Sequence, residues 1–235
     1  MINKENILFS IVGLLLGLIV GFFFANSVNQ SATVGSPAAA VAGMPSAAGL
    51  PGGHPPVPGA AGGSAPEVQA AIDAAKQNPN DFDAQIKAAQ LYYQIQRFEG
   101  AIEFLKRANE LQPDNYEVMV HVGDANFDAN KYEEAEKWYT DALAKKPEDN
   151  DVRTDLGLTF IFREKPDYDR AIKEFKRVLE TNPSHTQAMQ NLAVAYTKKG
   201  SAADAKGMLA QLEGIDPTNS ALPKLKEELK KLETK

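Results

Sequence analysis

The sequence predicts an all-α protein in which helical hairpins stack into a solenoid, preceded by one transmembrane helix. Five prolines recur at a nearly constant interval, at Pro79, Pro113, Pro147, Pro183 and Pro217. Each follows a stretch of helical apolar periodicity and precedes a polar residue of the type that caps a helix. An earlier apolar run, from Ile7 to Ala25, contains no charged residue, which predicts the membrane helix.

Composition and charge argue against several classes of function. The chain has 235 residues and no cysteine, which rules out disulfides, thiolate metal sites, cysteine catalysis and a lipid-bearing cysteine. Residues 1–65 carry only Lys4 and Glu5, so the formal net charge of −6 belongs to the chain from Pro66 onward. That part has no cluster of lysine and arginine and repels phosphates, so we expect no nucleic-acid partner.

Residues 1–25 are predicted to be an amino-terminal transmembrane anchor. As a helix, Ile7 to Ala25 would extend about 28 Å, close to the ~30 Å thickness of the hydrocarbon layer. A cleaved signal peptide is the alternative, because small residues follow Ala25, but its apolar stretch is usually shorter. Lys4 precedes the span and no charge follows it until Glu67, so the positive-inside bias places the rest of the chain outside the cytoplasm. We therefore expect a single-pass protein of a bacterial inner (cytoplasmic) membrane with a periplasmic repeat domain.

Three glycines share one face of this predicted helix. Gly13, Gly17 and Gly21 recur at every fourth residue. Small residues at that spacing let two transmembrane backbones approach closely, which predicts a helix-packing role and, with a second copy as partner, a homo-oligomer. The alternative is that glycine is simply common in membrane helices. The sequence leaves open whether the partner is a second copy or another membrane protein.

Residues 26–65 are predicted to be a disordered Ala/Gly/Pro-rich linker. They show no periodicity and hold too little apolar bulk to offset the entropy of ordering. A flexible coil of this length spans about 35 Å root-mean-square. Such a linker would keep the folded part near the bilayer but clear of it.

Between the prolines, small and bulky residues recur at fixed positions in four repeats, 80–113, 114–147, 148–183 and 184–217. The recurring residues are, in chain order, Ala88, Ala89, Tyr92, Ala101, Leu105, Ala108, Val122, Gly123, Ala135, Tyr139, Ala142, Leu156, Gly157, Phe160, Ala171, Phe175, Val178, Leu192, Ala193, Tyr196, Ala205, Leu209 and Leu212. This pattern resembles the tetratricopeptide repeat family. It departs from the family pattern in lacking the tryptophan, in Asn126 where an aromatic is usual, and in Val178 and Leu212 where alanine is usual.

The resemblance implies a right-handed solenoid of helical hairpins, with small residues where two helices cross. One hairpin cannot bury its apolar faces alone, so neighbours must stack. The third repeat has two extra residues, which we place in its inner turn near residues 164–167. Residues 66–79 are predicted to be a half-repeat helix. Residues 218–235 are predicted to hold a capping helix from Asn219 to Leu232, whose leucine stripe closes the stack; a dimerising coiled coil is the alternative.

In this family the first helix of each hairpin lines a concave groove that receives a peptide or a partner helix. The family's carboxylate clamp of Lys, Arg and Asn is missing here. The expected groove has an apolar floor and an acidic margin, which suits a basic amphipathic segment. The register places sixteen residues in it: Asp83, Ile86, Gln90, Tyr93, Glu117, Val120, Asp124, Phe127, Asp151, Thr154, Leu158, Ile161, Gln187, Gln190, Val194 and Thr197.

Catalysis has little support in the sequence. His121, Asp124 and Asp128 are spaced so that one helix could present them to a metal, but solvent-facing polar residues have the same spacing. No phosphate loop, H-E-x-x-H or nucleophile motif occurs. We therefore expect no enzyme activity, no cofactor and no metal.

The architecture favours a membrane-tethered adaptor that binds a protein or peptide partner. One anchor, a linker and a repeat domain resemble the periplasmic tetratricopeptide proteins of cytochrome c maturation, or of folding assistance near the translocon. Two alternatives stay open. One is an oligomeric membrane scaffold that associates through its glycine face, and the other is a cytosol-facing receptor with the opposite topology.

Overall fold

The computed structural model describes residues 65–234, which form ten helices and no strand. The predicted anchor with its three glycines, and the predicted linker up to residue 64, lie outside the described residues. Among residues 65–234, no helix has the length and apolar character needed to cross a membrane. The prediction of an all-α stack of hairpins is confirmed for this part of the chain.

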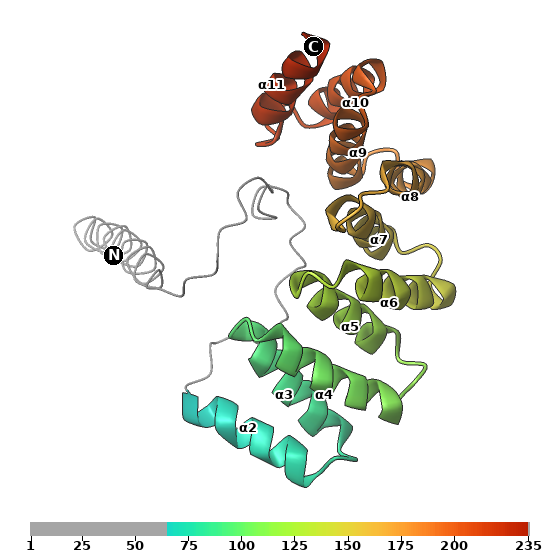
Figure 1. Cartoon of the computed structure of the whole chain (residues 1–235). Helices are drawn as coiled ribbons and strands as arrows, with labels where there is room; N and C mark the ends of the chain where they lie inside the picture. Colours follow the sequence, from blue (N-terminus) through green and yellow to red (C-terminus); the bar gives the residue numbers. More distant parts are fainter. Residues whose placement is uncertain (1–64, 235) are drawn as a thin grey trace, which may run out of the picture. The chain divides into compact units, whose positions relative to one another are not determined.

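The helices follow one another as a lone helix, four hairpins and a cap (Figure 1). The lone helix is α2 (Ala65–Gln77) and the cap is α11 (Leu222–Glu233). The hairpins are α3 (Phe82–Gln94) with α4 (Phe98–Leu111), α5 (Tyr116–Asp128) with α6 (Tyr132–Lys145), α7 (Asn150–Phe162) with α8 (Tyr168–Thr181), and α9 (Thr186–Lys199) with α10 (Ala202–Ile215).

The cap begins at Leu222 and not at the predicted Asn219. The Asn219 side chain accepts a hydrogen bond from the Ala221 N–H at 3.0 Å, and the Leu222 N–H donates to the Asn219 carbonyl at 3.1 Å. Asn219 therefore closes a turn ahead of the helix. Pro223 follows in the first helical turn, where its missing N–H has no intrahelical partner to lose.

Each helix packs mainly against the helices before and after it in the sequence. Two further contacts occur toward the carboxy-terminal end, where α7 packs directly against α9 and α11 packs against both α9 and α10. The buried side chains form one cluster from α2 to α5 and another from α5 to α11, and Trp138 packs against both. The core therefore runs continuously through the stack.

The first helix of each hairpin begins at a side-chain cap. Asp81, Asn115, Asp149 and His185 accept a hydrogen bond from the backbone N–H three residues later. Each cap comes shortly after one of the recurring prolines, so the proline spacing predicted where these helices begin. In His185 the accepting atom is Nδ1, while Nε2 lies 3.1 Å from Asp151 Oδ1 on α7.

Small residues lie at the helix crossings, as the resemblance implied. A β-carbon on Gly157 would stand 2.4 Å from the Phe175 ring, closer than real side chains approach. The first and fourth repeats have Ala89 and Ala193 in place of glycine. Their second helices carry Leu105 and Leu209 in place of the aromatic ring. Where the first helix has alanine in place of glycine, the second helix therefore has leucine in place of the larger aromatic residue.

The inner turns of three hairpins use a left-handed residue. Gln96, Asn130 and Gly200 have φ of 56°, 59° and 87°. The N–H of the next residue then bonds a carbonyl near the end of the helix, at 2.8–2.9 Å. The third hairpin turns through residues 163–167, where the Asp167 N–H reaches the Phe160 carbonyl at 2.8 Å. The two extra residues of the third repeat therefore fall in its inner turn.

Candidate functional site

The sixteen predicted groove residues divide by exposure. Nine are exposed or half-buried: Asp83, Ile86, Gln90, Tyr93, Glu117, Val120, Asp151, Gln187 and Thr197. Seven are buried: Asp124, Phe127, Thr154, Leu158, Ile161, Gln190 and Val194. Thr154, Leu158 and Gln190 are each 1% exposed, so in this conformation they pack the stack and present almost no surface to a partner. Partner binding by the exposed members stays a prediction.

The division follows the position along the stack. All four predicted residues of α3 are accessible, whereas in α7 only Asp151 is. On α5 and on α9 two of the four are accessible, and α7 packs directly against α9. The accessible inner residues are concentrated on α3 and α5. We call Asp83, Ile86, Gln90, Tyr93, Glu117, Val120 and Asp128 the α3–α5 inner surface.

A tyrosine–aspartate pair joins the two helices of this surface. The Tyr93 hydroxyl at the end of α3 donates a hydrogen bond to the Asp128 carboxylate at the end of α5. Burial, this hydrogen bond, and the charges of Asp128, Asp124 and Asp155 raise the pKa of Tyr93 far above its ordinary value. Tyr93 therefore stays neutral and donates at any physiological pH.

A second tyrosine–aspartate pair lies one helix further along. The Tyr139 hydroxyl of α6 donates to Asp124 of α5 at 3.0 Å, inside the core. Burial raises the pKa of Tyr139 well above its ordinary value, and the charges of Asp124, Asp155 and Asp128 raise it further. Asp124, a predicted groove residue, thus has its carboxylate turned partly toward the second helix of its own hairpin.

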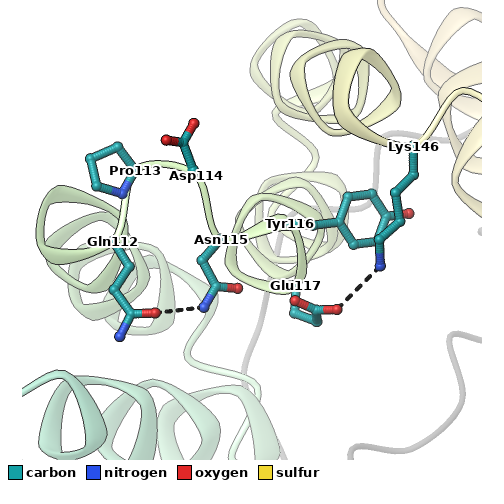
Figure 2. A pocket seen from close by; sticks show the side chains of 7 residues that line it. All are labelled: Gln112, Pro113, Asp114, Asn115, Tyr116, Glu117 and Lys146. Atoms are coloured by element: carbon teal, nitrogen blue, oxygen red, sulfur yellow. Dashed lines mark hydrogen bonds and ion pairs between the residues drawn. The ribbon is translucent and has the colours of Figure 1, made fainter.

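An open pocket of about 540 Å³ lies at the start of α5 (Figure 2). Glu117 of the inner surface points into it and pairs with Lys146 Nζ at 3.3 Å. The same Nζ lies 3.8 Å from the centre of the Tyr116 ring, in a cation–π contact. The Tyr116 hydroxyl donates to Asp149 at 2.6 Å, which links the second repeat to the cap of the third.

A second pocket, of about 580 Å³, lies at the end of α5. Its lining includes the aromatic residues Tyr92 and Phe98. It also includes the polar residues Asp128, Arg97 and Asn130. One pocket therefore lies at each end of α5, and each includes a carboxylate of the inner surface. Both hollows adjoin the half of the stack in which the predicted groove residues are accessible.

Phe162, the last residue of α7, was not among the predicted groove residues. It is half-buried, stacks on Tyr132 with ring centres 5.9 Å apart, and meets Phe127 edge-on at 5.8 Å. The sequence did contain a signal for it. Phe162 follows Asp128 by one repeat length and therefore has the same register position.

The arrangement at α5 has no metal-binding geometry. Asp124 faces Tyr139 and Asp128 faces Tyr93, so the spacing shared with His121 does not gather the three groups. Within residues 65–234, no three His, Cys, Asp or Glu side chains are grouped to hold a metal ion. The chemistry that these side chains offer is recognition through hydrogen bonds, charge and apolar contact.

Comparisons with known proteins agree on the repeat. The model of a family described as "Tetratricopeptide repeat" matches residues 67–117, 96–156 and 163–229, more than half of the chain. Photosystem I assembly protein Ycf3 of Prochlorococcus marinus (strain NATL2A) is 33% identical over 79 residues, covering 32% of this chain and 44% of that protein. The chain spans less than half the length of the curated relatives it matches.

Solved structures agree on the fold. The crystal structure of MamA superposes with a TM-score of 0.58 at 24% identity, covering 65% of this chain and 88% of that chain. YrrB, described as a TPR protein with an unusual peptide-binding site, superposes with a TM-score of 0.52 at 19% identity, covering 71% and 94%. At these identities the likeness establishes the fold alone. With the family match, the proline period and the hairpin stack in agreement, the chain belongs to the tetratricopeptide repeat family.

Proposed function

We propose that this chain is a membrane-tethered adaptor that binds a peptide or helix of a partner protein on the concave side of its stack. The observation that carries the proposal is the α3–α5 inner surface, where Ile86, Tyr93 and Val120 keep apolar area partly exposed. Family membership supports it, since such repeats present concave surfaces to other proteins. The names of two similar proteins point the same way, one to assembly and the other to peptide binding.

The tether and its location are further parts of the proposal. They rest on the apolar run of residues 7–25, on Lys4 before it, and on the uncharged stretch after it. A repeat domain held outside the inner membrane would meet proteins as they leave the translocon. Assisting the assembly or maturation of envelope proteins, as in cytochrome c maturation, is the role that this placement favours.

Site-specific crosslinking in cells tests the adaptor function. A photoreactive phenylalanine analogue replaces Val120 on the inner surface of the full chain, and Asp141, exposed on α6, is the control position. We expect a defined partner peptide to be captured from position 120 and not from position 141. Ile86→Glu in the same chain should remove that product. Equal capture from the two positions, or none from position 120, contradicts the proposal.

A second candidate, an oligomeric membrane scaffold, is favoured by the spacing of Gly13, Gly17 and Gly21. The size of the detergent-extracted protein separates the two, because the scaffold requires an oligomer that Gly17→Ile dissociates. Protease treatment of spheroplasts tests the topology. Cleavage of the repeat domain in intact spheroplasts supports the outward placement, whereas protection until lysis supports a cytosol-facing receptor.

A further inference from the structure

Three half-buried apolar side chains occupy inward register positions on α3 and α5, and we call them the apolar strip of the α3–α5 inner surface. Ile86 and Tyr93 lie seven residues apart on α3, about two helical turns or ~10 Å. Val120 follows Ile86 by one repeat length and so has the same register position on α5. The strip is two turns long and two helices wide. One face of a short amphipathic helix, with apolar residues at i, i+3 and i+7, has this length.

The charge around the strip is negative. Asp83 and Glu117 are exposed beside it, and Asp124 and Asp128 lie on the same helix as Val120. One cation, Lys146, pairs with Glu117 at 3.3 Å, and Asp128 accepts the hydrogen bond of Tyr93. Helix α5 contains no lysine or arginine, and α3 contains one, Lys87. The imbalance extends beyond these helices. Residues 66–149 contain 17 Asp and Glu against 9 Lys and Arg, whereas residues 150–235 contain 13 against 15.

Some of the same carboxylates raise the pKa values of tyrosine hydroxyls in this half of the stack. After burial, which is the largest cause, nearby carboxylates raise the pKa values of Tyr93, Tyr116 and Tyr139, with Asp124 acting on all three. A carboxylate disfavours a second anion at the hydroxyl because like charges repel. The same potential favours a cation placed near the surface, and it steers cationic ligands toward it.

We propose that the α3–α5 inner surface binds a basic amphipathic segment of a partner protein, whose apolar side contacts Ile86, Tyr93 and Val120. Lysine or arginine side chains flanking that apolar side face Asp83, Glu117 and Asp128. The inference rests on the proposed function, which it deepens by naming the chemistry of the partner and the half of the stack that receives it. The predicted groove residues that stay accessible on the third and fourth repeats, Asp151, Gln187 and Thr197, are all polar.

A matched pair of labelled peptides tests this. The probe is AKALKKLAKALKKA, a helical peptide with leucines at i, i+3 and i+7, and its control has glutamate for every lysine. Binding is measured by fluorescence anisotropy to the full chain in phosphatidylcholine nanodiscs, with empty nanodiscs subtracted. We expect the lysine peptide to bind at least about tenfold more tightly than the glutamate peptide, with an affinity that falls as salt rises.

Two double variants and their controls locate the site. Ile86→Gln with Val120→Gln should weaken binding about tenfold, because it removes the apolar contacts. Ile95→Gln with Ile215→Gln, which removes the large hydrophobic residues 44% and 47% exposed elsewhere, should leave binding unchanged. Asp83→Asn with Glu117→Gln should weaken binding and its salt dependence, whereas Glu133→Gln with Glu134→Gln on α6 should not.

Several results would overturn the inference. They are equal binding of the two peptides, retained binding in the Ile86/Val120 variant, or an equal loss in the Glu133/Glu134 control, which indicates unspecific charge attraction. Circular dichroism checks that each variant is folded, and the exposed Asp83/Glu117 pair keeps the test valid if the apolar variant unfolds. A crosslinked partner segment without excess lysine and arginine, or a second copy of this chain, contradicts the inference while the adaptor function stands.

Discussion

The ring of Tyr139 lies where a side chain on Gly123 would have to stand. A β-carbon added to Gly123 would be 2.5 Å from Tyr139 Cε1, and Tyr139 is fully buried and held to Asp124. Glycine is therefore required at this crossing by the close approach of the two helices of one hairpin. The ring cannot move aside without disturbing the core on both sides of it.

Gly123→Ala is expected to lower the free energy of unfolding by about 1–3 kcal/mol, because overpacking outweighs the gain in helix propensity. Urea unfolding followed by circular dichroism measures the change. Gly207→Ala is the control, since residue 207 lies inside α10 with nothing within 4 Å of an added β-carbon. It should stabilise the protein by up to about 1 kcal/mol. A similar effect of the two substitutions would contradict the packing argument.

Gln96→Gly is expected to raise the unfolding free energy by about 1 kcal/mol, because residue 96 has a positive φ of 56° that a side chain disfavours. Gly200 occupies the corresponding turn of the fourth hairpin at φ 87°. Gly200→Ala should therefore have the opposite sign. Thermal unfolding of the two variants beside the parent protein checks both signs, and no change in either would show that the turns relax freely.

Glu136 couples stability to pH. It bonds Arg163 at 2.6 Å and Arg170 at 2.5 Å. Burial alone would raise the pKa of Glu136, but the hydrogen bonds and charges of the two arginines outweigh burial and lower it. A carboxyl whose folded pKa lies below its unfolded value stabilises the fold above the unfolded value, about 4.3, and loses that effect as pH falls through the folded value.

Glu136→Gln should therefore lower the unfolding free energy at pH 7, on the order of 1–2 kcal/mol. Its stability should also fall less steeply than that of the parent below about pH 4.3. Urea unfolding at a series of pH values gives the two curves. Glu133→Gln, an exposed change on the same helix, is the control. Parallel acid limbs for Glu136→Gln and the parent would count against this coupling.

Leu225→Ala should cost about 2–4 kcal/mol, because Leu225 is 3% exposed where α11 closes the stack. The loss should come with increased binding of a hydrophobic dye, since the apolar side of α10 becomes accessible when the cap loosens. Lys224→Ala, an exposed change beside it, should stay within about 0.5 kcal/mol. Equal stability of the two variants would mean that α11 does not serve as a cap.

Asn191→Leu is expected to stabilise the protein. Asn191 is fully buried, and within residues 65–234 neither amide atom of its side chain has a hydrogen-bond partner. Removing such a group recovers about 1–3 kcal/mol. Asn126 is the matched control, because it is buried at 1% exposure but donates to the Val122 carbonyl at 2.7 Å. Calorimetric midpoints should rise for Asn191→Leu and not for Asn126→Leu.

Local chemistry made most of the fold predictable. The caps at Asn115 and Asp149, and the small residue at Gly157, act through neighbours within one hairpin, so their spacing carries the information. The start of α11 was misplaced because Asn219 prefers to cap a turn when its side chain can reach the Ala221 N–H. That choice depends on a local geometry that periodicity does not report.

The candidate site was only half predictable. The register assigned Ile86, Tyr93, Val120, Leu158 and Val194 to the groove alike, and the first three are half-buried. Leu158 and Val194 are nevertheless 1% and 5% exposed. The hydrogen bond between Tyr93 and Asp128 joins two different repeats, and no local sequence pattern predicted it.

The sequence by itself therefore determined the hairpins and their period. These follow from the 3.6-residue turn and from side chains that act within one repeat. Only the tertiary structure decided which inward positions remain open. Exposure there depends on how closely the first helices of adjacent repeats approach, and side chains distant in sequence set that spacing. All four predicted inward positions stay accessible on α3, two of four do on α5 and on α9, and only Asp151 does on α7, which meets α9 directly.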